Sequence, residues 1–460
     1  MGRYAMGVDF GTLSARALVV DVETGRELGG AVMEYPHGVL QERLPNGAPL
    51  PHGWALQHPE DYLECLRRVV PEALAQAGVN AAEVIGLGID CTASTSLPVL
   101  ADGTPLCFLP EYENNPYAYA MLWKHHGAQA QADRMTELAQ ARKEPFLARY
   151  GGRISSEWML PKLLQVLEEA PEVYERAARF VEAGDWIVSQ ITHSEARSAG
   201  SAGYKALWNP RDGYPSREYL AALQPRFAAV AEEKLAGPLL PLGARVGGVH
   251  PEAAAWLGLR PGTSVAAANI DAHVSVPVAG APRAGELMMI MGTSTCHILL
   301  AQEERAVPGM CGAVDGGATP GFLAYEAGQS CVGDLLGWFV EHCLSAECAR
   351  QAKEEGQSAH EFLTARAAKL RAGESGLIAL DWWNGNRSIL VDAHLTGLIL
   401  GMTLRTKPEE IYRALMEATA FGTRTIVEAF ERSGVPVRSV FACGGIAHKN
   451  PLMLQIYADV

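Results

Sequence analysis

The stretch YAMGVDFGTLSARALVVDVETG, residues 4–25, contains two short apolar runs separated by a polar segment. The runs Met6–Val8 and Ala17–Val20 have the length and composition of buried β-strands, so the stretch is predicted to form a hairpin. The connection at residues 9–14 carries a carboxylate and two hydroxyls, which is more polar than a buried hairpin needs. The hairpin is therefore a candidate binding site.

The polar connection has the chemistry of a phosphate site. Gly11 lets the backbone approach an anion, and the following amides with the Thr12 and Ser14 hydroxyls can donate hydrogen bonds to phosphate oxygens. Asp9 would repel phosphate unless Mg²⁺ lies between them, usually through retained water. We therefore interpret the hairpin as part of a nucleoside triphosphate site, with Asp9 as a water-mediated magnesium ligand.

A second stretch, LMMIMGTSTCHILLA at residues 287–301, repeats the order of strand, Gly-Thr-Ser turn and strand. The wide spacing of the two stretches indicates two related lobes, although two unrelated hairpins with glycine turns would give the same pattern. In the first interpretation, Gly292 and Thr293 are the phosphate-binding counterparts of the first hairpin.

A third stretch, residues 439–460, favours the two-lobe interpretation. Here a predicted strand runs into Gly444 and Gly445, and a helix begins near Asn450. A strand followed by glycines and a helix lets backbone N–H groups approach a ligand closely. We therefore expect all three residues to take part in nucleotide binding.

Composition limits the class of protein. The chain has 460 residues, 48% of them hydrophobic, which is typical of two folded domains. Its net charge of −14, without any run of Lys and Arg, argues against nucleic acid or anionic membranes as partners. Nine cysteines without a C-x-x-C pair indicate reduced thiols and a cytoplasmic protein. The G-x-x-x-x-G-K-[ST] motif and the protein-kinase motifs are absent from the sequence.

Seven motifs in one order resemble the FGGY carbohydrate kinases, a branch of the actin-like ATPase superfamily. They are GVDFGT (7–12), GLGIDCTA (86–93), SSEWMLPK (155–162), ANIDAH (268–273), MGTS (291–294), GLILGMTLRTKPEEIYRALMEA (397–418) and ACGG (442–445). Within the family, GWALQHPEDY (53–62), AGYKALW (202–208), YEAGQS (325–330) and LDWWNGNRS (380–388) resemble the branch that acts on L-ribulose. The resemblance covers essentially the whole chain.

The resemblance implies an α/β, two-lobed actin-like (ribonuclease H-like) ATPase fold with a deep cleft between the lobes. We expect a sugar-binding lobe with a helical insertion at residues 1–282 and a nucleotide-binding lobe at 283–460, with the boundary loop near Ala281–Gly285. Family members continue beyond the helix that follows Gly444 and Gly445. The second lobe is therefore expected to be incomplete at its C-terminus.

The resemblance also assigns roles to single residues. Asp271, at a predicted strand end, is expected to be the catalytic base, although a helix N-cap carboxylate would occur in the same place. Lys205, Glu326, Asp271 and the backbone around Ala93 are expected to hold a ketopentose, whereas a surface Lys and a surface Glu remain the simpler reading of the first two. Asp90 would bind sugar or cap a turn, and both alternatives stay open.

The activity implied is the transfer of phosphate from ATP to L-ribulose with Mg²⁺, which gives L-ribulose 5-phosphate in L-arabinose catabolism. Two alternatives remain: a related kinase for xylulose, ribitol or glycerol, and a catalytically silent sugar sensor on the same fold. The sensor is disfavoured because the sequence has no DNA-binding segment ahead of the first hairpin. A homodimer is expected as the assembly. Trp123 and Lys124 would line the sugar pocket, whereas a tryptophan in a helical segment is more often a core residue, and both alternatives stay open. Trp382 and Trp383 would stack on a ligand or simply pack, and Asn384, Asn386 and Arg387 receive no role.

Overall fold

The computed structural model describes residues 2–280 and 282–460. They form two compact units. Unit 1 comprises the described residues of Met1–Leu147, Ile154–Val274 and Val314–Phe322, and unit 2 comprises those of Ala148–Arg153, Ser275–Ala313 and Leu323–Val460. The expected boundary loop begins at Ala281, which lies outside the described residues. The chain passes from unit 1 to unit 2 between Val274 and Ser275.

Unit 1 is built on a mixed sheet with the order β11-β12-β5-β1-β2-β3, in which β13 also pairs with β5. The strands are β1 (Tyr4–Phe10), β2 (Ser14–Asp21), β3 (Glu27–Glu34), β5 (Val84–Cys91), β11 (Arg245–Gly248), β12 (Ser264–Ala266) and β13 (Asn269–Ile270). The first three pair antiparallel, whereas β5 runs parallel to β1, β12 and β13. The two apolar runs of the opening stretch therefore lie in β1 and β2.

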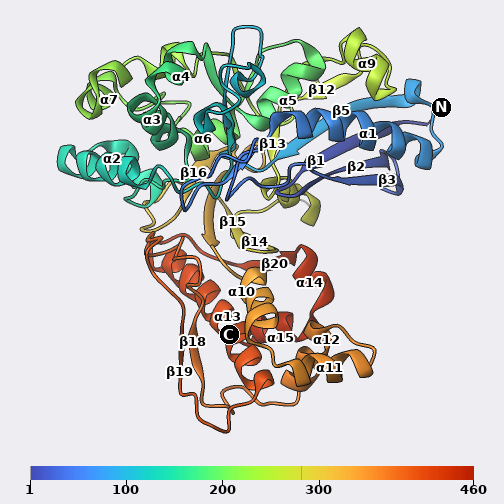
Figure 1. The fold of residues 1–460 in the computed structure, drawn as a ribbon, viewed down its shortest axis with the longest axis vertical. Helices are drawn as coiled ribbons and strands as arrows, with labels where there is room; N and C mark the ends of the chain where they lie inside the picture. The colour runs from blue at the N-terminus through green and yellow to red at the C-terminus, as the bar shows by residue number, and fades with distance from the viewer. Residues whose placement is uncertain (1, 281) are drawn as a thin grey trace. The chain divides into compact units, whose positions relative to one another are not determined.

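Helix α1 (Pro59–Ala77) covers β2 and β3 (Figure 1). It begins with proline at its first position and ends at Gly78, whose φ of 63° suits glycine in a C-terminal cap. Gly29 of β3 permits the close packing, because a Cβ there would lie 2.4 Å from the backbone nitrogen of Ala77.

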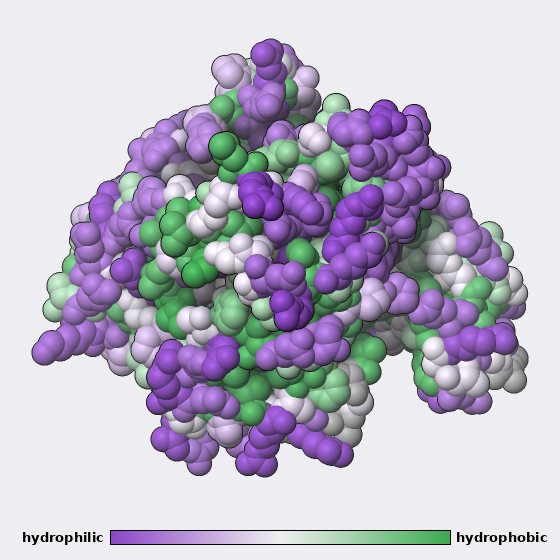
Figure 2. All heavy atoms as spheres, turned by 90° about the horizontal axis from the view of Figure 1, so that it is seen from below, coloured by the Kyte–Doolittle hydropathy of each residue, from purple (hydrophilic) through white to green (hydrophobic). Residues whose placement is uncertain are grey.

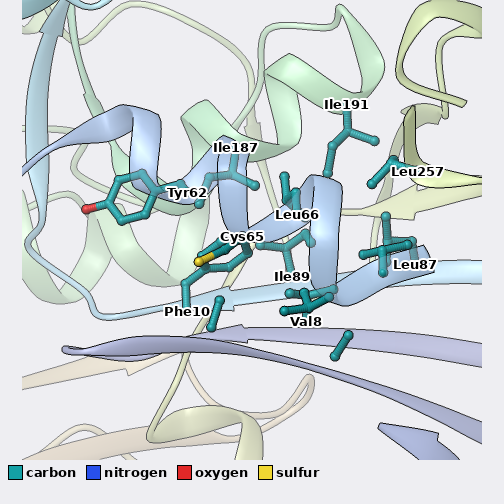
Figure 3. Close-up of a cluster of buried hydrophobic side chains, with 14 of the residues drawn as sticks. Val8, Phe10, Tyr62, Cys65, Leu66, Leu87, Ile89, Ile187, Ile191 and Leu257 are labelled. Atoms are coloured by element: carbon teal, nitrogen blue, oxygen red, sulfur yellow. The ribbon is translucent and has the colours of Figure 1, made fainter. Parts of the chain in front are cut away.

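The main core of unit 1 joins this sheet to three helices. Besides α1, these are α5 (Ala183–Thr192) and α9 (Pro251–Leu257), which supply further side chains of the core. Figure 3 shows the labelled side chains of this core, which are Val8, Phe10, Tyr62, Cys65, Leu66, Leu87, Ile89, Ile187, Ile191 and Leu257. Burial of these apolar side chains fixes β1 and β5 side by side, and with them the polar residues at the strand ends.

The other elements of unit 1 include a second sheet of order β4-β7-β6-β8. Its strands are β4 (Leu56–Gln57), β6 (Ser96–Val99), β7 (Ala120–Met121) and β8 (Arg179–Glu182), and β9 (Arg197–Ser198) pairs with β10 (Leu239–Leu240). The helices are α2 (Gln129–Arg142), α3 (Met159–Glu169), α4 (Pro171–Arg176), α6 (Ala199–Lys205), α7 (Arg217–Leu223) and α8 (Val230–Glu233). The expected helical insertion thus also contains the short strands β7 and β8.

Unit 2 contains most of a five-stranded sheet of order β16-β17-β15-β14-β20. The strands are β14 (Glu286–Met291), β15 (Thr295–Ala301), β16 (Gly312–Asp315, its first two residues in unit 2), β17 (Leu323–Gln329) and β20 (Ser439–Cys443). Strands β18 (Ile378–Leu380) and β19 (Leu398–Leu400) form a separate antiparallel hairpin, which lies between β17 and β20 in the sequence. The helices are α10 (Gly333–Trp338), α11 (Ala346–Glu354), α12 (Ala359–Ala367), α13 (Pro408–Arg432), α14 (Gly445–Lys449) and α15 (Pro451–Asp459).

Several large apolar side chains of unit 2 reach the surface. On the β18–β19 hairpin and the turn after it they are Ile378, Leu398, Leu400, Met402 and Leu404, and on the edge strand β20 they are Val440 and Phe441. Figure 2 shows hydrophobic residues among hydrophilic ones on the face of the molecule seen from below. Within residues 2–280 and 282–460, no helix combines the length and apolar character needed to cross a bilayer.

Candidate functional site

Three carboxylates meet at one edge of the unit 1 sheet. Asp9 and Asp90 are register partners in the parallel strands β1 and β5. Asp271 directly follows β13, which also runs parallel to β5, and its N–H donates to the Cys91 carbonyl at 3.1 Å. Because parallel strands end at the same edge, the sheet itself brings the three side chains together.

The electrostatics of this carboxylate cluster favour a bound cation. Burial raises the pKa of Asp90 to about 9, and the negative charges of Asp9 and Asp271 add to the shift. Burial also raises the pKa of Asp271 to about 6. Oδ1 of Asp90 is buried and has no hydrogen-bond partner among the described residues. A divalent cation, directly or through its waters, would neutralise the repulsion and satisfy this oxygen, so the cluster fits Mg²⁺.

Asp90 is the residue that sequence reasoning left undecided, and the structure places it at the centre of the cluster. A turn cap is not its role, because none of its described contacts is to a turn N–H. The signal was present in the sequence: Gly7-Val8-Asp9 and Gly88-Ile89-Asp90 are the same pattern at the ends of two apolar runs. Only the strand order shows that these two ends are neighbours.

Asp271 has one local hydrogen bond that bears on the N-cap alternative. Its Oδ1 accepts from the N–H of Ala272 at 2.7 Å. The 3₁₀ helix that follows begins only at His273, so this bond does not reach the second or third N–H of the helix, as an N-cap would. The carboxylate therefore remains available to a ligand.

The first hairpin turn is held by side chains from distant parts of unit 1. Gly11 N–H donates to the Ser14 carbonyl at 3.0 Å, which closes the turn. Gln57 Nε2 donates to the Thr12 carbonyl at 2.9 Å, and Trp123 Nε1 donates to Thr12 Oγ1 at 3.1 Å. Trp123, for which the sequence left a pocket and a core position open, thus orients the hydroxyl of the predicted phosphate turn.

The predicted sugar ligands of unit 1 lie near the carboxylate cluster. Lys205 ends α6 and is only 8% exposed, so it is not a surface lysine. Its positive charge acts to lower the pKa of Asp271, against the larger effect of burial. Ala93 lies in the turn between β5 and β6, two residues after the end of β5. Both are thus close to strand ends that carry the carboxylates.

The second hairpin, in unit 2, has a turn similar to the first. Gly292 N–H donates to the Ser294 carbonyl at 2.9 Å, and the Thr293 carbonyl accepts from Val332 N–H at 2.8 Å. These bonds tie the turn to the start of α10 (Figure 1). Thr293 is consequently held by its backbone, which leaves its side chain to other contacts.

The glycine turn after β20 is sterically tight. Gly444 has a φ of 93°, and a Cβ there would lie 2.5 Å from the Met291 carbonyl oxygen. Gly445 begins α14. Asn450 is the N-cap of α15, where its Oδ1 accepts from Met453 N–H at 3.1 Å. The structure therefore shows a helix-capping role for Asn450.

Glu326 lies in the middle of β17 in unit 2 and is 6% exposed, so it is not a surface residue either. It belongs to a different unit from Lys205 and Asp271. In the segment 382–387, Trp383 packs its ring 5.3 Å from that of Trp338, which gives this tryptophan a place in the core of unit 2.

Comparison with known proteins gives matches over nearly the whole chain. Residues 4–276 and 287–460 match the N-terminal and C-terminal domains of the FGGY family of carbohydrate kinases. The ribulokinase of Halalkalibacterium halodurans is 54% identical over 459 residues, which are 100% of this chain and 82% of that protein. The ribulokinase of Mycolicibacterium smegmatis is 54% identical over 462 residues, covering 100% of this chain and 81% of that protein.

Solved structures share the fold. Xylulose kinase from Rhodospirillum rubrum aligns with a TM-score of 0.78 at 23% identity, covering 99% of this chain and 84% of that one. Plasmodium falciparum glycerol kinase with ADP aligns with a TM-score of 0.73 at 15% identity, with coverage of 99% and 84%. The predicted two-domain α/β fold is confirmed, and the chain belongs to the FGGY family of carbohydrate kinases.

Proposed function

We propose that the protein transfers phosphate from ATP to L-ribulose, giving ADP and L-ribulose 5-phosphate in L-arabinose catabolism. The observation that carries this proposal is 54% identity, over the full chain, to proteins named ribulokinase. The carboxylate cluster and the glycine turns at Gly11 and Gly292 supply the groups that phosphoryl transfer to a sugar hydroxyl needs. These are a base, a cation site and hydrogen-bond donors to the phosphates.

The two parts of the chain take different partners in this proposal. Residues 1–282 form the sugar-binding lobe and residues 283–460 the nucleotide-binding lobe. In support, unit 1 holds Lys205, Ala93 and Asp271 near one sheet edge, whereas unit 2 holds the glycine turns at Gly292 and Gly444.

Asp271 is the proposed base. It accepts the proton of the attacking sugar hydroxyl as that oxygen bonds to the γ-phosphorus of ATP, and the bond to the leaving ADP oxygen breaks. Lys205, Glu326 and the Ala93 backbone hydrogen-bond the sugar and orient this hydroxyl. The raised pKa of Asp271, about 6, makes it a stronger proton acceptor than an exposed aspartate.

The phosphates would lie against the glycine turns. Gly11, Thr12 and Ser14 donate from the first hairpin, and Gly292 and Thr293 donate from the second. The nucleotide would contact the start of α14 at Gly444 and Gly445, and the segment as far as Asn450, whose side-chain oxygen already serves as a cap.

Mg²⁺ is the proposed metal, with Asp9 as its ligand through water and Asp90 beside it. The cation would supply charge neutralisation for the triphosphate. The support is the buried, unpartnered Oδ1 of Asp90 in a cluster of three carboxylates. Without a cation, burial and nearby negative charge favour protonation of Asp90 and Asp271.

The test is a coupled ADP-release assay with ATP, Mg²⁺ and a panel of L-ribulose, xylulose, ribitol and glycerol. The proposal predicts the highest kcat/KM on L-ribulose. A higher value on another member of the panel would identify the alternative kinase. Sugar binding by calorimetry without any ADP release would instead identify a silent sensor.

The remaining expectations concern assembly and location. We place the reaction in the cytoplasm, where ATP is available and where the nine cysteines of the sequence would stay reduced. We expect a homodimer, and the exposed apolar side chains of β18 and β19, such as Leu398 and Leu400, are a candidate contact. Light scattering on the parent and a Leu400→Lys variant would test it, because a monomeric parent would exclude the dimer.

A further inference from the structure

Lys162 is a fully buried lysine that no step above uses. It lies in the first turn of α3 and is 0% exposed. Its Nζ donates to three backbone carbonyls: Ser94 at 2.6 Å, Leu122 at 2.9 Å and Met121 at 3.2 Å. An ammonium has three donors, so all of them are used, and they tie two separate segments of unit 1 to α3.

The first of these segments is the turn that contains Ala93. Ser94, the next residue, has a φ of 64°, which is unusual for a residue with a side chain and is strained by about 1 kcal/mol or more. The bond from Lys162 to the Ser94 carbonyl fixes the peptide group in this orientation. The Ala93 backbone, a proposed sugar contact, is therefore positioned by Lys162.

The second segment leads to the phosphate turn. Leu122 and Met121, whose carbonyls accept from Lys162, directly precede Trp123. The indole N–H of Trp123 donates to the hydroxyl of Thr12. The ammonium of Lys162 thus contacts the sugar turn directly on one side and reaches the phosphate turn through Trp123 on the other.

The charge around Lys162 is balanced inside the same unit. Burial lowers the pKa of Lys162, and the negative charges of Glu182 and Glu157 oppose this shift. Glu182, in β8, is buried as well, and the positive charges of Lys162 and Lys205 oppose the rise that burial gives its pKa. The pKa of Lys162 falls to about 7, so these negative charges keep part of the amine protonated at pH 7, and an ammonium makes stronger hydrogen bonds to carbonyls than a neutral amine.

We propose that Lys162 is a positioning residue for phosphoryl transfer: it holds the Ala93–Ser94 turn against the sugar and, through Trp123, the Thr12 hydroxyl against the phosphates. The proposal rests on the proposed function of the site. It predicts two separable effects, one on the sugar and one on the nucleotide, because the two segments are held by different bonds of the same ammonium.

The first variant is Lys162→Met, which keeps the length of the side chain and removes the charge and the three donors. Its kcat/KM for L-ribulose should fall about 10- to 100-fold, and its KM for ATP should rise, since buried carbonyls without donors would reorient their segments. Lys162→Gln, which retains two N–H donors, should give a smaller loss. It also serves if the Met variant does not fold.

The matched control is Lys234→Met. Lys234 is another buried lysine of unit 1 that donates to a carbonyl, that of Ala177 at 2.6 Å, and none of its described contacts is to the site. Its loss should lower the melting temperature and leave kcat/KM within about twofold of the parent. If the two Met variants have the same kinetics, Lys162 is only structural and the proposal is wrong.

The second test is rescue. In Lys162→Met/Ser94→Gly, glycine adopts the positive φ without help, so the KM for L-ribulose should recover toward that of Ser94→Gly alone. The KM for ATP should stay raised, because the Trp123 segment gains nothing from this glycine. Equal recovery of both constants, or recovery of neither, would overturn the proposal.

The parent is first assayed on the four-sugar panel, so that the two failures can be distinguished. If it acts on a different sugar, the proposed function is wrong, and the Lys162 variants are then compared on that sugar with the same expected ratios.

Discussion

Asp271→Asn should remove activity and stabilise the fold at the same time. Asparagine has the same shape and can still accept the hydrogen bond from Ala272 N–H with its Oδ1. It cannot accept a proton. Loss of a general base lowers the rate by about 10²–10⁴-fold, so kcat should fall by this factor while the KM for ATP changes little. In a loose transition state the attacking hydroxyl loses its proton late, so the base contributes less to the rate. This favours the lower figure.

The stability effect follows from the pKa of the carboxyl group. Burial raises the pKa of Asp271 to about 6 in the folded protein, against 3.8 for an unperturbed aspartate. Between pH 3.8 and about pH 6, the folded state therefore keeps a proton on Asp271 that the unfolded state has lost. The free energy of unfolding falls as pH rises through this window. At pH 7 the whole difference opposes folding, by about 3 kcal/mol. Asp271→Asn should melt roughly 3–5 °C above the parent at pH 7, and close to the parent at pH 4.

The assay combines steady-state kinetics on L-ribulose with thermal melts at pH 7 and pH 4. Asp185→Asn is the matched control, because burial raises the pKa of Asp185 to about 6 as well, and Asn can still accept from Ser198 N–H. It should gain stability and keep kcat within about threefold. If Asp271→Asn also keeps kcat within threefold, Asp271 is not the base. If its melting temperature falls at pH 7, the carboxylate is structural and the electrostatic account is wrong.

Three further predictions concern other residues. Lys205→Met should raise the KM for L-ribulose about 10- to 100-fold with ATP binding nearly intact, and it should move the acid limb of kcat/KM to higher pH because the lysine charge lowers the pKa of Asp271; equal losses for both substrates would indicate a structural role. Asp9→Asn should raise the Mg²⁺ concentration for half-maximal activity about tenfold or more, measured after removal of metal with EDTA, and an unchanged value would exclude it as a ligand. His125, neutral and buried with its pKa lowered to about 3, binds a proton in the unfolded state first, so stability is lost as pH falls below 6.5. Urea unfolding should show about 2 kcal/mol more loss from pH 7 to pH 5 in the parent than in His125→Gln, and equal losses would contradict the assignment.

Local patterns in the sequence predicted the two hairpins to which we assign phosphate binding. The alternation of apolar runs with Gly-Thr turns located β1, β2, β14 and β15, because hairpins depend on residues that are close in sequence. The family resemblance supplied the two-domain fold and the candidate base. Asn450 shows the limit of this reasoning. An Asn directly before Pro451 at the start of a helix is accounted for by its N-capping role, so the sequence alone does not distinguish capping from nucleotide binding.

The sequence could not show which strand ends lie next to one another, because this depends on the order of the strands in the sheet. Asp9 and Asp90 are 81 residues apart and become adjacent only because β5 pairs with β1 rather than with an edge strand. Lys162 received no role from the sequence, and its burial depends on carbonyls from residues 94, 121 and 122.

Pairing between strands that are distant in sequence also explains why the carboxylates of the cluster repel one another in the folded protein. Each carboxylate of the cluster sits at the end of a strand whose core side chains hold it in place, so repulsion among Asp9, Asp90 and Asp271 cannot relax by movement of the backbone. The strain is instead expressed as raised pKa values at Asp90 and Asp271. A bound cation would relieve this repulsion. Metal binding and the charged state of Asp271, the proposed base, therefore have the same physical origin. Mg²⁺ should therefore raise the melting temperature of the parent more than that of Asp90→Asn, and an equal shift in both would show that the cluster does not bind the ion.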